Sequence, residues 1–257
     1  MSELVQHVAA RDGAWRRLVL GGSKGNLLSL DLMRALGQQI HALESERGIK
    51  WLTVEGSGGE FSYGAKIQEH TPDLMGTVLP ETHRIIKQLL AFPAPTAALV
   101  EGRCLGGAFE LAMACDDVIA TESALFGLPE IRLGAFPPAA AAILPLRVGA
   151  SRATRAIVTG QTQEALYWHD AGLLSMVAPQ VDLATASAAW FDAHLAPHSA
   201  AALSHAVAAA RLTLRAQAEP ALDAAERDYL GGLSKTDDAV EGVNAWLQKR
   251  SPNWSNR

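Results

Sequence analysis

Two short stretches rich in apolar residues open the chain, and a polar turn separates them. They occupy residues 4–9 and 15–20, with Arg11, Asp12 and Gly13 in between. Short apolar runs flanking a turn that contains glycine are typical of paired strands. The chain is therefore predicted to begin with a β-hairpin.

A helical pattern follows the hairpin. The apolar residues that recur at intervals of three and four are Leu32, Met33, Leu36, Ile40 and Leu43. This spacing places them on one face of an α-helix. Ser29 or Asp31 can cap the free amides at its start, and the helix is predicted to end near Gly48.

Farther along, patterns of buried strands alternate with helical patterns. Strands are predicted at 51–54, 96–100, 118–120 and 174–177, and helices at 80–91 and 107–114. Alternation of strands and helices is typical of layered α/β domains.

After about residue 182 the strand signal ends and alanine-rich helical segments take over. Pro197 and Pro220 are predicted to mark helix starts. We therefore divide the chain into an α/β core, residues 1–181, and a C-terminal helical region, residues 182–257.

The composition excludes several classes of protein. The 257 residues are 49% hydrophobic, which suits a globular fold, and the net charge of −5 with no basic run disfavours nucleic acid as a partner. The N-terminus has no signal-peptide pattern, and no apolar run reaches the roughly 18 residues of a membrane helix. Since only Cys104 and Cys115 are present, we expect a cytoplasmic protein without disulfides.

Histidine and cysteine give no sign of a metal or a nucleophile. His70, His83 and His169 have no spacing typical of a zinc site or a catalytic triad. We therefore predict no metal and assign no catalytic role to these side chains.

The first candidate site segment is F-S-Y-G-A at residues 61–65. It follows a predicted strand and a glycine-rich loop, where the backbone can turn an amide toward a ligand. Taken alone, the segment is better explained by an ordinary tight turn.

The second candidate segment, residues 101–112, leads from a strand through two glycines into an apolar helix. The first amides of a helix lack partners, and the helix dipole makes this end favourable for a developing oxyanion. Glu110 lies in the first turn. It either complements the dipole on a solvated face or, given its apolar neighbours, is a buried functional carboxylate.

The third candidate segment places Glu130 in a loop bounded by proline and glycine at residues 126–134. Two carboxylates in different surroundings can hold different protonation states, as acid–base catalysis at neutral pH requires. The alternative is a surface glutamate paired with Arg132.

Together, F-S-Y-G-A at 61–65, L-G-G-A-F-E-L at 105–111 and L-P-E-I-R-L-G at 128–134 resemble the crotonase (enoyl-CoA hydratase/isomerase) superfamily. The likeness extends to K-G-N-L-L at 24–28, T-G-Q-T at 159–162 and A-G-L-L-S at 171–175. It therefore covers most of the chain.

This resemblance implies a spiral of repeated ββα units whose C-terminal helical region builds homotrimers or homohexamers. It also implies an acyl-CoA thioester as the substrate, with no further cofactor. By motif position, the backbone amides of Ala65 and Gly107 would hold the thioester oxygen. Glu110 and Glu130 would activate a water molecule and protonate the substrate carbon.

Two departures from the family pattern point to one branch of it. Lys66 stands where many members have aspartate, and residues 136–141 replace a glycine-rich turn, so that Pro138 stiffens the wall of the acyl pocket. With the run at 61–72, these features resemble a branch that hydrates a cyclic dienoyl-CoA in anaerobic benzoyl-CoA degradation. The residues predicted to contact the substrate or CoA are Lys24, Leu27, Ser62, Lys66, Ile67, Phe136 and Pro138.

Other functions remain open at this point. A straight-chain enoyl-CoA hydratase or isomerase would use the same glutamates, and a non-catalytic acyl-CoA-binding scaffold would keep the fold alone. A dinucleotide-binding module is disfavoured because the chain has no G-x-G-x-x-G run followed by an acidic residue.

Overall fold

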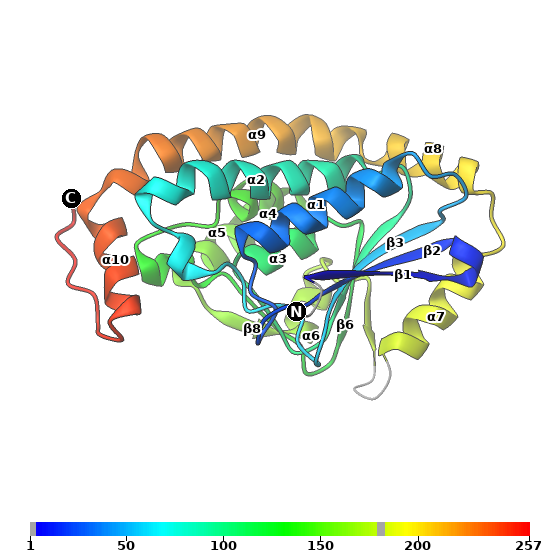
Figure 1. Cartoon of the computed structure of the whole chain (residues 1–257), viewed down its shortest axis with the longest axis horizontal. Coiled ribbons are helices and arrows are strands. Elements are labelled where there is room, and N and C mark those ends of the chain that lie inside the picture. The colour runs from blue at the N-terminus through cyan, green and yellow to red at the C-terminus, as the bar shows by residue number, and fades with distance from the viewer. Residues whose placement is uncertain (1–3, 179–182) are drawn as a thin grey trace.

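Six strands form the larger of two sheets in the computed structural model, which describes residues 4–178 and 183–257 (Figure 1). In spatial order they are β1 (Val5–Ala10), β2 (Trp15–Leu20), β3 (Trp51–Gly56), β4 (Thr96–Val100), β6 (Asp117–Thr121) and β9 (Met176–Ala178). β1 and β2 pair antiparallel, whereas every other neighbouring pair is parallel.

The smaller sheet consists of three short strands. They are β5 (Arg103–Leu105), β7 (Leu125–Gly127) and β8 (Thr162–Glu164). Since β5 directly follows β4 and β7 directly follows β6, the chain passes repeatedly from the larger sheet to the smaller one. A bridge between Ser62 and Cys104 continues this pattern after β3. The predicted α/β spiral of ββα units is confirmed.

Helices cover the sheets. They are α1 (Leu30–Glu44), α2 (Pro72–Ala91), α3 (Gly107–Met113), α4 (Pro138–Val148), α5 (Ala150–Thr159), α6 (Ala165–Asp170), α7 (Leu183–His194), α8 (Ala200–Ala210), α9 (Leu212–Gly231) and α10 (Asp237–Leu247). Short 3-10 helices are η1 (Arg11–Gly13), η2 (Ile67–Glu69), η3 (Pro129–Leu133) and η4 (Leu233–Lys235). Figure 1 shows α9 running alongside α2, and α9 also packs on α4.

The first predicted elements form for the expected reasons. The hairpin pairs Val5 with Leu20, as predicted. Helix α1 begins after Ser29, whose Oγ accepts a hydrogen bond from the Leu32 N–H at 3.2 Å. The helix ends at Glu44 and not near Gly48, because its buried face ends at the residue before.

Two predicted helix starts, at residues 80 and 220, were wrong. Pro80 lies inside α2, which begins eight residues earlier at Pro72, and Pro220 lies inside α9. Each proline removes one helical hydrogen bond. Burial on both sides of the proline outweighs this loss, with Leu79 and Ile85 flanking the first one. Pro197 precedes α8 and does not start it.

One arginine joins the C-terminal helices to the core. Arg211 is 5% exposed, and its Nε donates to Asp116 Oδ1 at 2.7 Å. It also donates to the carbonyl oxygens of Phe92 and Ala94. This ion pair connects residues almost a hundred positions apart and fixes the start of α9. The predicted boundary between residues 181 and 182 lies outside the described residues.

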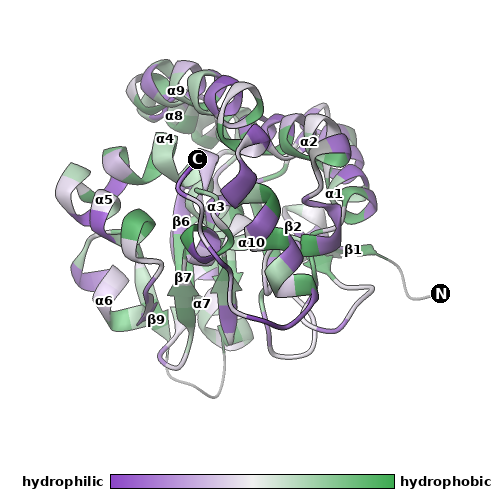
Figure 2. Cartoon of the chain, turned by 90° about the vertical axis from the view of Figure 1, so that its left-hand side faces the viewer, coloured by the Kyte–Doolittle hydropathy of each residue, from purple (hydrophilic) through white to green (hydrophobic). Residues whose placement is uncertain are grey.

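Hydropathy follows the layers. Figure 2 shows the strands β6 and β7 as predominantly hydrophobic, while hydrophilic residues recur along α1 and α2. At one end of the larger sheet, Trp15 packs against Trp51 and Phe191 of α7, with ring centroids 4.9 and 5.7 Å away. In the part of the chain that the structure describes, no helix combines the length and hydropathy of a membrane span.

Candidate active site

The first wall of the site is a backbone turn after β3. Gly64 has a φ of +91°, and a Cβ atom there would lie 2.4 Å from the carbonyl oxygen of Leu105, so the turn requires glycine. The Leu28 N–H donates to the Gly64 carbonyl oxygen at 2.9 Å, and the Leu28 carbonyl oxygen accepts from the Lys66 N–H at 3.2 Å. Between them, the Ala65 N–H donates no hydrogen bond to any described residue. This amide is available to a ligand.

A buried asparagine holds this turn in place through hydrogen bonds. Asn26 is 2% exposed, and its Nδ2 donates to three carbonyl oxygens of residues 57–61 at 2.8–3.2 Å. The Ser62 hydroxyl donates to the Asn26 carbonyl oxygen at 2.7 Å and accepts from the Gly64 N–H at 3.1 Å. Ser62 is fully buried, so its side chain orients the turn and does not line the cavity.

The second wall is the start of α3. A Cβ atom on Gly107 would lie 3.9 Å from the Cβ of Ala65 and 3.8 Å from Oε2 of Glu110. The backbone at Gly107, the Ala65 turn and one carboxylate therefore meet at one place. The Gly107 N–H is at the helix start, where it has no helical partner. The structure brings together the two amides that the motifs predicted.

Glu110 is the first of two carboxylates in this place. It projects from α3, is 5% exposed, and its Oε1 accepts a hydrogen bond from the Ala140 N–H at 2.9 Å. Burial raises the pKa of Glu110 to about 7, while hydrogen bonds from the amides of Ala140 and Ala139 act in the opposite direction. The buried carboxylate predicted from the apolar neighbours is confirmed.

Glu130 lies on η3, close to the other carboxylate. Its Oε1 lies 2.6 Å from the position that a Cβ atom would take on Gly106, so this glycine makes room for the carboxyl group. Its Oε2 is buried without a hydrogen-bond partner among the described residues. Burial and the negative charge of Glu110 raise the pKa of Glu130 to about 8.

Arg132 does not pair with Glu130, contrary to the surface-loop alternative. Its Nη2 donates instead to the carbonyl oxygen of Gly160 at 3.0 Å. Among the described residues no cation pairs with Glu130 to hold it ionised, which agrees with its raised pKa.

A cavity of about 720 Å³ opens onto these groups. The predicted site residues among those that line it are Lys24, Leu27, Ala65, Ile67, Gly107, Glu110, Glu130, Phe136 and Pro138. Ser62 and Lys66 are not among them. The Lys66 Nζ instead pairs with Glu69 Oε1 at 3.1 Å, and its side chain is 44% exposed.

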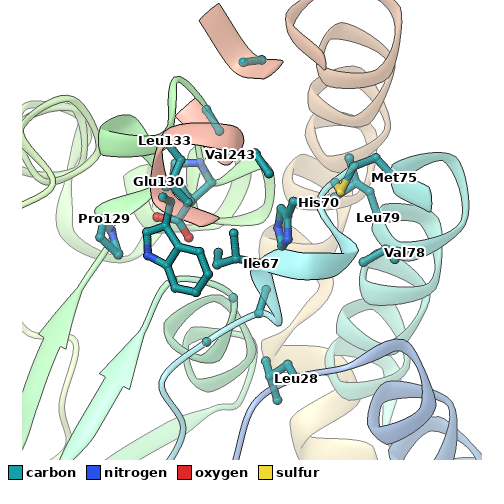
Figure 3. A pocket seen from close by; sticks show the side chains of 18 of the residues that line it. Leu28, Ile67, His70, Met75, Val78, Leu79, Pro129, Glu130, Leu133 and Val243 are labelled. Carbon is teal, nitrogen blue, oxygen red and sulfur yellow. The ribbon is translucent and has the colours of Figure 1, made fainter. Parts of the chain in front are cut away.

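The residues that line the cavity opposite the two glutamates were not predicted from the sequence. Figure 3 shows His70, Met75 and Leu79 across the cavity from Glu130. The C-terminal region adds further lining residues, among them Tyr229 of α9 and Val243 of α10. The helical tail, predicted only as a trimerisation region, therefore supplies part of the cavity.

The charge of the cavity is confined to a few groups. Its cationic lining residues within the described chain are Lys24 and Arg132, both exposed. His70 Nδ1 lies 3.4 Å from the Lys66 carbonyl oxygen, and burial lowers the pKa of His70, which favours a neutral ring. Among the described residues, no group of three or more His, Cys, Asp or Glu side chains forms a metal site.

Comparison with known proteins places the chain in a family. The sequence model of the enoyl-CoA hydratase/isomerase family matches residues 22–257. The chain belongs to this family. The motifs at 61–65, 105–111 and 128–134 therefore predicted the family correctly, and this member of the enoyl-CoA hydratase/isomerase family is an acyl-CoA hydratase, a carbon–oxygen lyase.

Individual relatives agree with this assignment. Cyclohexa-1,5-dienecarbonyl-CoA hydratase of Thauera aromatica is 37% identical over 96% of this chain and 95% of that protein. The 2,3-dehydroadipyl-CoA hydratase of Escherichia coli is 36% identical over 90% of this chain and 91% of its own. The crystal structure of an enoyl-CoA hydratase from Mycobacterium avium subsp. paratuberculosis has a TM-score of 0.86 at 25% identity, covering 98% of this chain and 99% of that one.

Proposed function

We propose that this enoyl-CoA hydratase adds water to cyclohexa-1,5-diene-1-carbonyl-CoA and forms 6-hydroxycyclohex-1-ene-1-carbonyl-CoA in anaerobic benzoyl-CoA degradation. The observation that carries the chemistry is the buried Glu110 and the partly buried Glu130 beside two free backbone amides, all lining one cavity. The cyclic substrate is supported by the 37% identity to the Thauera aromatica enzyme.

The amides of Ala65 and Gly107 would bind the thioester oxygen. Negative charge grows on this oxygen when the conjugated system accepts hydroxide, so the two donors stabilise the transition state more than the ground state. Loss of one such donor costs about 3 kcal/mol. Since both donors are backbone groups, the side chain at position 65 needs only to be small.

The glutamates would divide the acid and base roles. Glu110, with one oxygen held by the Ala140 amide, is the better candidate for the ionised base. Glu130, with the higher pKa and a partnerless oxygen, would carry the proton. Glu110 takes one proton from water, the hydroxide bonds to a ring carbon, and Glu130 delivers its proton to another carbon. A proton moving from Glu110 to Glu130 restores the pair.

The acyl group of the substrate would be uncharged. A dicarboxylic acyl chain needs a cation near its far end, because a buried carboxylate without a partner is costly. Lys24 is exposed, Arg132 is engaged with Gly160, and His70 favours its neutral form. This distribution of charge disfavours 2,3-dehydroadipyl-CoA and agrees with a hydrocarbon ring.

The other substrate contacts follow from the cavity. We infer that Lys24 and Leu27 contact the CoA portion, and that Ile67, Phe136 and Pro138 contact the acyl portion. Lys66 is placed to attract CoA phosphates from outside the cavity. Ser62 would act through the turn that it supports.

The assembly and location complete the proposal. We infer a homotrimer or homohexamer in the cytoplasm. The C-terminal region exposes several large apolar side chains that a neighbouring subunit would cover, namely Leu212, Trp246, Leu247 and Trp254. Analytical ultracentrifugation of the purified protein tests the oligomeric state, and a monomer would refute it.

Steady-state hydration with three substrates tests the function. We expect the highest kcat/KM with cyclohexa-1,5-diene-1-carbonyl-CoA, a lower value with crotonyl-CoA, and the lowest with 2,3-dehydroadipyl-CoA, with products identified by mass spectrometry. Preference for crotonyl-CoA would favour the second candidate, a straight-chain hydratase or isomerase. Turnover of none would favour a non-catalytic acyl-CoA-binding scaffold.

A further inference from the structure

Tyr229 lines the same cavity as the two glutamates. Its side chain is 7% exposed and lines the cavity, and its ring centroid lies 5.5 Å from that of Phe136. Tyr229 comes from α9, whereas Phe136 comes from the segment just before α4. The two rings therefore join the C-terminal region to the core at this end of the cavity.

Three apolar side chains of α2 continue the same wall. Met75, Val78 and Leu79 form a buried cluster with Tyr229, and all four residues line the cavity. Figure 3 shows the three α2 side chains along one side of the cavity. Because α2 and α9 lie side by side (Figure 1), the Tyr229 ring lies between the side chains of α2 and Phe136.

This wall lies on the acyl side of the site. The thioester oxygen is placed at the amides of Ala65 and Gly107, and the glutamates act on carbons of the acyl group. The charges of Glu130 and Glu110 act on Tyr229 and, together with burial, raise the pKa of its hydroxyl group to about 12. Tyr229 therefore keeps its proton, so the wall that it forms is neutral.

We propose that Tyr229 is a specificity-determining residue whose ring ends the acyl subsite and limits the acyl group to a short chain or a single ring. This inference rests on the proposed binding of acyl-CoA in the cavity but not on hydration, and it concerns the length of the acyl group. The aromatic ring of Tyr229, and not its hydroxyl group, limits the length of the acyl group, because the ring occupies the space between α2 and Phe136.

Binding of saturated acyl-CoA thioesters tests the proposal without any turnover. We would measure Kd by calorimetry for butyryl-, hexanoyl-, octanoyl-, decanoyl- and dodecanoyl-CoA. Each buried methylene group strengthens binding about fourfold, which corresponds to about 0.8 kcal/mol. For the wild-type protein we expect this gain for the short thioesters and no gain for the long ones.

Three variants separate the ring from other effects. Tyr229→Ala removes the wall, so its affinity should continue to rise with chain length. Tyr229→Phe keeps the ring and should bind like the wild type. Leu222→Ala truncates a fully buried α9 side chain that does not line the cavity, and it controls for general loosening of the helix.

The outcomes are distinct. A plateau in the wild type that disappears only in Tyr229→Ala supports the proposal. A steady gain up to dodecanoyl-CoA in the wild type, or the same loss of the plateau in Tyr229→Phe or Leu222→Ala, overturns it. If Tyr229→Ala does not fold, Tyr229→Leu is measured in its place, with partial loss of the plateau expected. Absence of binding for every thioester would refute the proposed function itself.

Discussion

The two sides of the cavity are built in different ways. On one side, Ala65 and Gly107 present backbone amides, and glycines at 64 and 106 make the geometry possible. On the other side, side chains of α2, α9 and α10 form the wall. A backbone wall is insensitive to most side-chain changes, whereas a side-chain wall changes shape with each substitution. The first side therefore suits a common reaction, and the second suits selection among substrates.

The largest effect is expected from substituting the two glutamates, which removes proton transfer and leaves both sides of the cavity in place. We expect Glu110→Gln and Glu130→Gln each to lower the hydration rate about 1,000-fold, because each removes one proton-transfer step. Binding of butyryl-CoA, measured by calorimetry, should change little, since the amides remain. Wild-type turnover in either variant would show that the pair does not catalyse the reaction.

The second largest effect is expected from substituting Gly106, on the side of the cavity that the backbone forms. In Gly106→Ala the new Cβ would meet Glu130 Oε1 at 2.6 Å, at a residue with a φ of +53°. We expect displacement of the carboxyl group and a fall in kcat of about 100-fold. Gly172→Ala is the matched control, because Gly172 has a φ of +78° and no heavy atom within 4 Å of the new Cβ. Equal losses in both variants would mean that backbone strain alone is responsible.

The carboxyl group of Glu130 should also lower the free energy of unfolding at neutral pH. The folded-state pKa of Glu130 is about 8, above its ordinary 4.5, so the folded state binds the proton more tightly. Stability that depends on this proton is present below about pH 4.5 and is lost as pH rises toward about 8. Glu130→Gln should therefore be more stable than the wild type at pH 8, by roughly 4 kcal/mol.

Urea unfolding at pH 5 and pH 8 measures this difference. The stability gap between Glu130→Gln and the wild type should widen as pH increases. A gap that stays constant, or that narrows toward pH 8, would contradict the buried and partnerless placement of this carboxyl group.

The smallest expected effect concerns Lys66, outside the cavity. Its exposed ion pair with Glu69 contributes less than about 1 kcal/mol to stability. We expect Lys66→Ala to leave kcat unchanged and to raise KM for the CoA ester by less than about threefold, with a weaker dependence on salt. A large fall in kcat would show that this side chain reaches the reacting atoms.

The sequence was sufficient for the backbone side of the site. Gly107 and Glu110 lie within one helical turn, and Ala65 follows a glycine in a short motif, so the resemblance of these motifs to the crotonase superfamily was enough to locate them. The hairpin and the strands β3, β4 and β6 were also readable, since each depends on nearby residues. These features could be predicted because they require no knowledge of distant packing.

The side-chain wall was not readable in the same way. Tyr229 stands in a long polar and alanine-rich helix, about a hundred residues after Glu130, and no local pattern separates it from its neighbours. His70 was assigned no role, because it reaches the cavity only through the packing of η2 against α2. The helix starts predicted at residues 80 and 220 were wrong for a related reason, since tertiary burial outweighs the local preference of proline.

The buried pair between Arg211 and Asp116 has a consequence for the order of folding. The elements that hold the amides and glutamates are complete by residue 140, and the ribosome delivers them before the last three helices. The part of the cavity wall that Tyr229 supplies forms only when α9 packs on the core. The contact between Arg211 and Asp116 that holds α9 there joins residues 95 positions apart, and contacts between residues so distant in sequence form slowly. We expect the nascent chain to pass through a state in which the two amides and the two glutamates are in place, while the side of the cavity that α9 and α10 form is still missing and solvent reaches the site.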